Sequence, residues 1–159
     1  MPEASDEAYI DLALAEAVRA SDHHDVPVGA VVVVDGSIVA SRHNERELLG
    51  DPTAHAEILA LRDASERLGR WRLSGAVLYV TLEPCPLCAG AAVASRLDRV
   101  VFGAADSKAG ACGSLYNLCS DPRLNHEVAV TQGVRAKEAG QLLSDFFANR
   151  RQQDRSAPG

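Results

Sequence analysis

Apolar and polar positions follow two different periods along the chain. Residues 6–20 carry apolar side chains three or four positions apart, which predicts a helix with one buried face. Residues 28–34 are mostly β-branched, and residues 37–43 again have the pattern of a strand. The dipeptide Asp35-Gly36 between them is typical of a two-residue hairpin turn. The first part of the chain therefore predicts a helix followed by a β-hairpin.

The rest of the chain alternates strand and helix patterns. Pro52, in Asp51-Pro52-Thr53, suits the first turn of a helix that we expect to end at Gly69. The elements expected after it are a strand at 76–81, an alanine-rich helix from Pro86 to about 97, a strand at 98–104, a short helix near Leu115, a weak strand at 127–131 and an amphipathic helix at 134–151. This order predicts an α/β fold, a three-layer α/β/α sandwich around a central mixed five-stranded sheet.

Length and composition are those of a globular protein with one domain. The chain has 159 residues, of which 47% are hydrophobic and 24% charged. We expect a single domain over residues 1–159, with its core at about 6–151 and a flexible tail at 152–159. The longest apolar run, 26–34, is far shorter than the roughly 20 residues that span a bilayer. The acidic opening segment is not a leader, so we expect a cytoplasmic protein with no membrane partner.

The net charge of −6 is not spread evenly along the chain. Residues 1–25 hold seven acids and one base, so they account for all of it, and the remainder is neutral. Acidity is therefore only a weak argument against a nucleic-acid partner. Arg150, Arg151 and Arg155 lie close together near the end, where they could meet phosphates or merely solvate a helix end. The segment 45–49 (ERELL) is acidic beside the expected pocket mouth, which is unfavourable for a phosphate.

Three residues have the chemistry and placement of metal ligands. Cys85 and Cys88 are three residues apart at a strand–helix junction, so their sulfurs face the same way in a first helical turn. Helix N-termini lower thiol pKa values, and thiolates suit a borderline-soft metal. His55 opens another helix after a strand, at the same edge of an open α/β sheet. We therefore expect the three side chains to converge on one Zn²⁺ per chain.

Three protein ligands leave one coordination position open. Structural zinc sites usually close with four protein ligands, whereas catalytic sites keep a position for water, whose pKa falls to about 7. Glu57, two residues after His55, can reach such a water and move its protons. Alone, C-x-x-C could be a redox pair or half of a zinc knuckle. Together, H-x-E and P-C-x-x-C match the signature of the zinc deaminases.

The chain resembles the bacterial tRNA-specific adenosine deaminases, within the cytidine deaminase superfamily. The resemblance covers about Tyr9 to Arg151. The stretches that carry it include VPVGA (26–30), DPTAHAE (51–57), LYVTLEPCPLCAG (78–90), RVVFGA (99–104), LNH (124–126) and LLSDFF (142–147). The zinc motif is common to the superfamily, and the stretches from Phe102 onward favour the tRNA branch. Pro86-Leu87, between the two cysteines, departs from the usual family pattern.

The resemblance implies a cytidine deaminase-like fold and hydrolytic deamination of the wobble adenosine of a tRNA anticodon loop to inosine. Zinc-bound hydroxide would attack C6 of adenine, with Glu57 as the proton shuttle. It also implies a homodimer that binds the anticodon arm of tRNA and uses no organic cofactor.

The same resemblance assigns substrate contacts. Asn44 would hydrogen-bond the purine, and a backbone N–H near Ala54, together with Val26 and Pro27, would hold the base. Asp106 and Lys108 would touch the ribose or the backbone, or else form only a loop ion pair. The remaining candidates are Phe147, for stacking on a base if Phe146 is the core member of that pair, and Arg150, for a phosphate.

Two other functions stay open. One is a small-molecule deaminase of the same superfamily, acting on guanine, cytosine or a free nucleoside such as cytidine. The other is a zinc-stabilised RNA-binding module without activity. Glu57 argues against the module, because a structural zinc needs no carboxylate at an open position. The loop at 124–126 and the arginines of the last helix argue against a small substrate.

Overall fold

The computed structural model describes residues 4–156, and its centre is one five-stranded sheet. The strands are β1 (Gly29–Val34), β2 (Ser37–His43), β3 (Ala76–Leu82), β4 (Arg99–Ala104) and β5 (Ala129–Thr131). Their order across the sheet is β2-β1-β3-β4-β5. β1 runs antiparallel to both β2 and β3, whereas β3, β4 and β5 are parallel. The mixed five-stranded sheet predicted from the sequence is confirmed.

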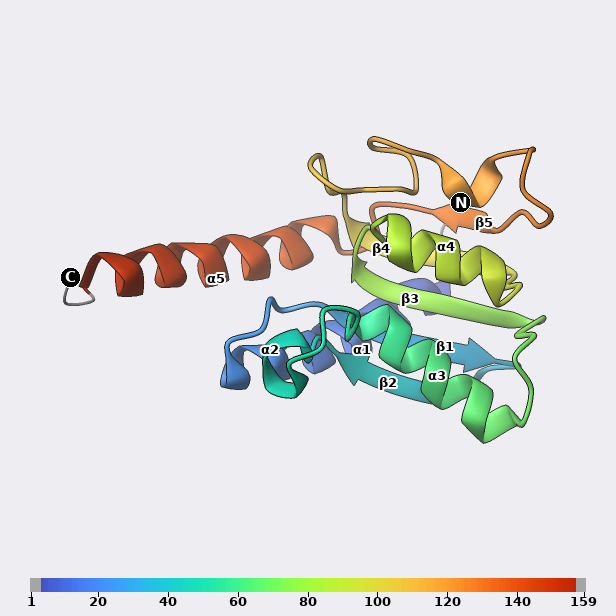
Figure 1. Ribbon diagram of the computed structural model, residues 1–159, viewed down its shortest axis with the longest axis horizontal. Coiled ribbons are helices and arrows are strands. Elements are labelled where there is room, and N and C mark those ends of the chain that lie inside the picture. Colours follow the sequence, from blue (N-terminus) through green and yellow to red (C-terminus); the bar gives the residue numbers. More distant parts are fainter. Residues whose placement is uncertain (1–3, 157–159) are drawn as a thin grey trace.

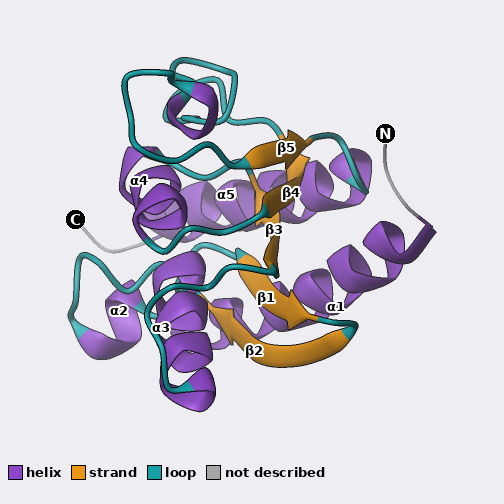
Figure 2. Ribbon diagram, turned by 90° about the vertical axis from the view of Figure 1, so that its right-hand side faces the viewer, coloured by secondary structure: helices purple, strands orange, loops and turns teal. Residues whose placement is uncertain are grey.

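Helices cover both faces of the sheet (Figures 1 and 2). The helices are α1 (Ala4–Ala20), α2 (Arg46–Leu49), α3 (Ala56–Leu68), α4 (Pro86–Ala94) and α5 (Ala136–Ser156), with short 3₁₀ turns η1 (Ser21–His23) and η2 (Leu118–Ser120). α3 and α4 lie on one face, and α1 and the start of α5 lie on the other. The three-layer sandwich is therefore confirmed. Among the described residues, no helix is both long and apolar enough to cross a membrane.

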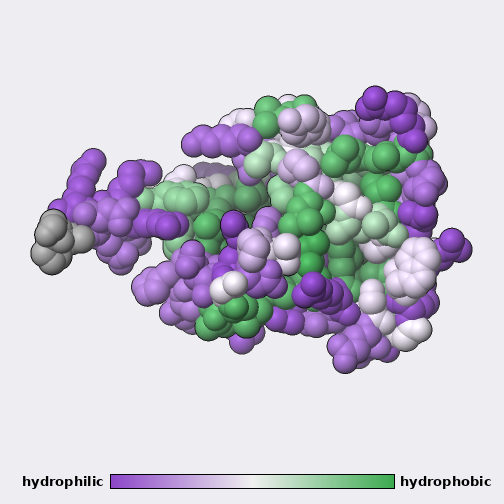
Figure 3. Space-filling model, viewed as in Figure 1, coloured by the Kyte–Doolittle hydropathy of each residue, from purple (hydrophilic) through white to green (hydrophobic). Residues whose placement is uncertain are grey.

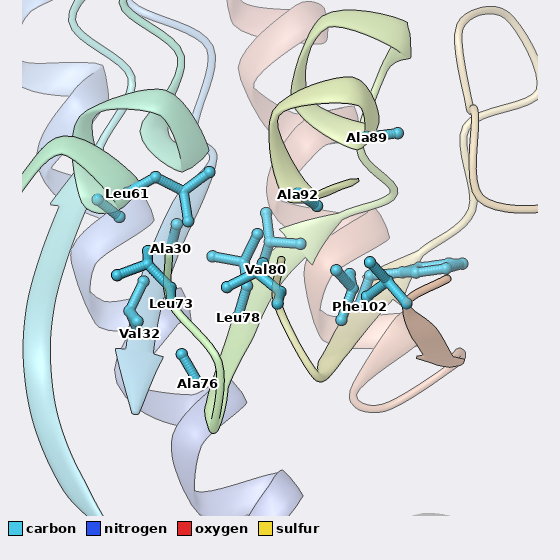
Figure 4. Packing of buried hydrophobic residues seen from close by; sticks show 14 of the residues in the cluster. Ala30, Val32, Leu61, Leu73, Ala76, Leu78, Val80, Ala89, Ala92 and Phe102 are labelled. Atoms are coloured by element: carbon cyan, nitrogen blue, oxygen red, sulfur yellow. The ribbon is translucent and has the colours of Figure 1, made fainter. Parts of the chain in front are cut away.

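The strands bury alternate residues on the two faces, as a sheet covered on both sides requires. Val31 and Val33 pack with Ile10 of α1, whereas Val32 and Leu78 point to the α3 and α4 side (Figure 4). Much of the buried face of the two helices on that side consists of small side chains. The buried alanines are Ala56, Ala60 and Ala64 in α3, and Ala89 and Ala92 in α4. Because alanine side chains are small, the axes of α3 and α4 can lie close to the sheet. The positions of the first turns of both helices follow from this close packing.

A close approach of backbones fixes the start of β1. A Cβ on Gly29 would lie 1.8 Å from the carbonyl oxygen of Ala13 in α1. Only glycine fits there without displacing the helix. The Gly29 N–H also donates to Thr81 Oγ1 of β3 at 3.2 Å. Residues 26–28, which lead into β1, are thereby held at the edge of the sheet where β2, β3 and β4 end.

One expectation about the middle of the chain is wrong, and one helix there was not predicted. The helix predicted to start at Pro52 begins at Ala56. The side chain of Asp51 accepts hydrogen bonds from the N–H and the hydroxyl of Thr53, both 2.8 Å, and so forms a turn that competes with a helix. α2 was not predicted, because its cap comes from far away. Asp25 accepts from the N–H groups of Glu47 and Leu48, which the local sequence pattern does not reveal.

Two further boundaries differ near the end of the chain. The short helix expected near Leu115 lies at Leu118–Ser120 and is a 3₁₀ turn. The last helix continues through Ser156, into the stretch expected to be a tail, so residues 152–156 are helical. Residues 157–159 of that predicted tail lie outside the described part of the chain.

Candidate active site

The first turns of α3 and α4 meet where β2 and β3 end. His55 is the N-cap residue of α3 and Cys85 that of α4, and Cys88 lies in the first turn of α4. The Nδ1 of His55 is 3.4 Å from Cys88 Sγ and 3.7 Å from Cys85 Sγ. One ligand atom from each of the three lies within 4.8 Å of the others. The structure brings together the three side chains that the sequence predicted to converge.

The thiol groups of Cys85 and Cys88 share one proton, which leaves negative charge on Cys85 that a cation can bind. The thiol of Cys88 donates a hydrogen bond to Cys85, which is the main reason why the pKa of Cys85 is lowered to about 4. The same bond is the largest cause of the raised pKa of Cys88, and burial adds to it. The pKa of His55 is raised, chiefly by its hydrogen bond with Cys85. A divalent metal would displace the shared proton, since thiol ligands bind metals as thiolates.

The donor set can be tested against metal chemistry. Two sulfurs and one imidazole nitrogen are the ligand types of zinc and of related borderline-soft metals. Among the described residues, no fourth histidine, cysteine or carboxylate joins this group. The residues present therefore fit a metal centre with three protein ligands and an open position.

Glu57 lies in the first turn of α3, next to this cluster. Its side chain is buried, with 4% of the residue exposed, although it is a carboxylate. Burial is the largest influence on its pKa and raises it, against a hydrogen bond from Cys88 and the nearby His55. A carboxyl group whose proton affinity is raised is better suited to accept a proton and later return it.

A pocket of about 190 Å³ opens onto these groups. The residues that line it are Val26, Val28, Asn44, Arg46, His55, Glu57, Leu82, Glu83, Cys85, Asp106 and Ala109. Three of the residues predicted to bind substrate, Val26, Asn44 and Asp106, are therefore in its wall, together with His55, Cys85 and Glu57. The lining comes from the ends of β2, β3 and β4, from the approach to β1 and from the start of α3, so five separate segments meet here.

Asn44 connects two walls of the pocket. Its Oδ1 accepts a hydrogen bond from the Ala56 N–H at 2.7 Å, so the side chain caps α3. Its Nδ2 donates to the carbonyl oxygen of Val26 at 3.1 Å. Each bond uses only part of the capacity of the amide, which has two donor hydrogens and two acceptor lone pairs. Asn44 is therefore held rigidly while it keeps capacity for a ligand.

Three other predicted residues lie outside the lining. Pro27 is buried behind the wall. The N–H of Ala54, expected near the base, donates instead to the carbonyl oxygen of Asp51 at 3.2 Å, inside the turn before α3. The side chain of Lys108 is exposed, and its backbone N–H donates to Asp106 Oδ1 at 3.0 Å.

The two predicted residues of α5 lie away from this pocket. Arg150 and Phe146 border a separate hollow of about 460 Å³ between α5, η1 and α2. Phe147 is the more exposed of the two phenylalanines, at 40%, and its ring meets that of Phe146 edge to face at 5.4 Å. Three acids, Glu47, Asp145 and Asp154, share the hollow with Arg150.

Two charged residues of the pocket, Arg46 and Glu83, were not predicted from the sequence. The segment 45–49 was expected to present acidic charge, but its member in the lining is Arg46. Glu45 is bound to Arg42 at 2.9 Å, and Glu47 lines the other hollow. The segment 45–49 therefore contributes a base to the pocket wall, whose carboxylates, Glu57, Glu83 and Asp106, come from other segments. The sequence shows Glu83 directly before Pro84-Cys85, which could have marked it as a site residue. It does not show why Glu83 is buried, because the groups that hydrogen-bond to it come from a distant loop.

The fold and this site define a deaminase. The family model described as MafB19-like deaminase matches residues 4–151. The tRNA-specific adenosine deaminase of Bacillus subtilis is 49% identical over 152 residues, which cover 96% of this chain and 94% of that protein. A solved structure from work on A-to-I editing by tRNA:A34 deaminases at the wobble position of transfer RNA superposes with a TM-score of 0.83. The two chains are 44% identical, and the match covers 86% of this chain and 99% of the chain in that structure.

The chain belongs to the family of bacterial tRNA-specific adenosine deaminases. A more distant similarity links it to a guanine deaminase structure from Bacillus subtilis. That structure is 30% identical, with a TM-score of 0.61, and covers 91% of this chain and 93% of its own. The resemblance noted in the sequence is confirmed, and so is the assignment as an enzyme.

The metal cluster makes a direct prediction. Cys88→Ala removes a buried ligand atom 3.4 Å from His55 Nδ1, so the purified variant should hold much less than one metal ion per chain. Cys112→Ala is the matched control, because Cys112 is a buried thiol outside the cluster. Elemental analysis measures both. Full metal content in the Cys88 variant would contradict the assignment.

Proposed function

We propose that this chain deaminates the wobble adenosine of a tRNA anticodon loop to inosine. The observation that carries the proposal is the buried Glu57 beside the His55, Cys85 and Cys88 cluster, at the base of a small pocket. The identity of the chain to tRNA-specific adenosine deaminases over almost its whole length supports the choice of substrate.

We propose zinc as the metal, one ion per chain, held by His55, Cys85 and Cys88. When bound, zinc lowers the pKa of a water molecule so that it can attack as a nucleophile near neutral pH. Two thiolates neutralise the charge of the dication. The buried carboxylate of Glu57 would then lie beside a neutral metal centre, which favours its taking up a proton.

Glu57 is proposed to move protons between the attacking water, the purine ring and the departing ammonia. Its burial keeps bulk water away, and the raised proton affinity matches a group that is protonated and deprotonated in turn. Asn44 is proposed to orient the purine through the amide capacity that its two structural hydrogen bonds leave over. Val26 and Asp106, which both line the pocket, are proposed to contact the base and its ribose.

The shape of the pocket fits a base that has been turned out of its stack. The pocket is small and is closed at its inner end by buried residues of the sheet, so a paired base cannot reach it. Turning a base out costs least in single-stranded segments such as an anticodon loop. Arg46 lies at the lining and is exposed, so it is proposed to meet a backbone phosphate there. Arg150 and Phe147 are proposed to contact more distant parts of the anticodon arm, and Lys108 the backbone beside the pocket.

The guanine deaminase similarity keeps a small-molecule substrate as the second candidate. It is weaker in identity, 30% against 49%, and in superposition, with a TM-score of 0.61 against 0.83. A cationic side chain at the pocket mouth also has a role with a nucleic acid that it lacks with a free base. We propose the bacterial cytoplasm, where its tRNA substrate occurs, as the location of the enzyme.

A homodimer is also proposed. An apolar groove of about 430 Å³ runs between α3 and α4, bordered by Ile58, Leu61, Trp71 and Ala91, and Figure 3 shows hydrophobic side chains gathered on this face. Ile58 follows Glu57 directly, so a second copy on this face would lie next to the site. Light scattering should give about twice the chain mass of 16.9 kDa, and a mass of one chain would oppose the dimer.

Glu57→Gln should retain the metal and the fold but lose turnover. The amide keeps the shape of the side chain but cannot take up and return a proton, and such groups contribute about 10²–10⁴-fold to rate. Glu66→Gln, on the exposed side of the same helix, is the matched control and should keep wild-type turnover. Metal content and single-turnover rates are measured for both. Turnover of Glu57→Gln close to that of the control would rule out this role.

The substrate is tested by direct competition. The purified enzyme is given an anticodon stem-loop with a wobble adenosine, free adenosine, guanine or cytidine, and products are scored as inosine or released ammonia. The stem-loop should have the highest kcat/KM, and its KM should rise with salt, because phosphate contacts release counterions. Faster turnover of guanine or cytidine, with a KM that ignores salt, would favour the small-molecule function.

A further inference from the structure

The carboxylate of Glu83 is buried and fully engaged in hydrogen bonds. The residue is 2% exposed and lies between the end of β3 and the ligand Cys85. Oε1 accepts from the N–H of Asp106 at 3.0 Å and from the hydroxyl of Ser114. Oε2 accepts from the N–H groups of Cys112 and Ser114, both at 3.0 Å. These four bonds use the whole acceptor capacity of a carboxylate, so Glu83 has none left for a ligand.

All four donors come from one loop, residues 105–117, which follows β4. The loop contributes Asp106 and Ala109 to the wall of the pocket. A Cβ on Gly110 would lie 2.4 Å from the carboxylate carbon of Glu83, so the loop backbone rests directly on the carboxylate. The N–H of Ala111 adds a bond to the carbonyl oxygen of Pro84 at 2.8 Å. The loop is thus wrapped around the segment that leads into Cys85.

The charge of Glu83 follows from these contacts. Three backbone N–H groups and one hydroxyl donate to its two oxygens, which is the arrangement of donors that an ionised carboxylate accepts. The group is therefore an acceptor-only carboxylate, suited to holding N–H groups and unsuited to moving protons. Hydrogen bonds to a charged acceptor are stronger than neutral ones, so the loop is held more firmly than by backbone bonds alone.

We propose that Glu83 is a positioning residue for substrate binding, which holds the loop 105–117 as a wall of the pocket and sets where Asp106 meets the bound nucleotide. The proposal rests on the proposed function in that the nucleotide is the wobble residue of the RNA. Glu83 does not touch the reacting atoms. Its loss should therefore weaken binding of the RNA more than it slows the chemical step.

Glu83→Gln tests this with the smallest change in shape. An amide has one oxygen, so its NH₂ must face two of the four donors. The hydroxyl of Ser114 can rotate to accept, which leaves the Asp106 N–H opposed by another donor. We expect KM for the anticodon stem-loop to rise about tenfold or more, because bonds to a charged group are lost, while kcat falls less than about threefold. Metal content should stay at the wild-type value.

Ser114→Ala is the graded variant, since it removes one donor and keeps three. It should raise KM by a smaller factor and also serves if Glu83→Gln does not fold. If KM stays at the wild-type value in both variants while metal content and fold are intact, the proposal is overturned. A fall in kcat alone would overturn it too, because it would place Glu83 in the chemical step.

Hydrogen exchange separates this proposal from the function on which it rests. The amides of Asp106, Cys112 and Ser114 should exchange faster in Glu83→Gln than in wild type, while those of β1 and β3 should not change. This measurement needs no substrate. If wild type fails to deaminate the stem-loop but the loop amides are released, the proposed function fails and the positioning of the loop stands. Unchanged exchange at these amides would contradict the positioning itself.

Discussion

The first turns of α3 and α4 must meet within hydrogen-bond distance, and the rest of the site depends on that meeting. His55 Nδ1 lies 3.4 Å from Cys88 Sγ although the two residues come from different helices on different strand ends. Small buried side chains let both helices lie close on the same face of the sheet. The side chain of Asn44 caps α3 from the end of β2, so the direction of its first turn is fixed by a neighbouring strand. The metal-ligand cluster is thus a consequence of how two helices are seated.

Two buried glutamates near this junction show how environment divides one residue type into two roles. Glu57 is buried with few donors, and burial raises its pKa. Glu83 is equally buried but receives four hydrogen bonds, and its pKa is lowered. The first suits proton transfer and the second suits a fixed acceptor that shapes the pocket. Both side chains line the same pocket, one on α3 and one beside α4.

The sequence predicted the parts of the fold that depend on local pattern. The strand and helix periods gave the layers, and the spacing of His55, Cys85 and Cys88 placed three ligands at one sheet edge. The sequence pattern could not predict features that depend on hydrogen bonds between residues far apart along the chain. Asp25 caps α2 from 22 residues away, and Glu83 gathers a loop 23 to 31 residues further along the chain. The start of α3 was misplaced for the opposite reason, because the short-range bonds of Asp51 with Thr53 override a proline that suits a helix start.

The proposed catalysis depends most on a metal centre with three protein ligands and one open position. X-ray absorption on the zinc-loaded enzyme measures this directly, because it counts the atoms around the metal. It should show two sulfurs at about 2.3 Å and two lighter atoms at about 2.0–2.1 Å, one from His55 and one from solvent. The signal of the solvent ligand should change when the enzyme binds an RNA that carries a transition-state analogue of the base. A coordination shell with three or four sulfurs, or a shell that does not change when the RNA binds, would indicate a closed structural metal site. Either result would contradict a catalytic centre with an open position.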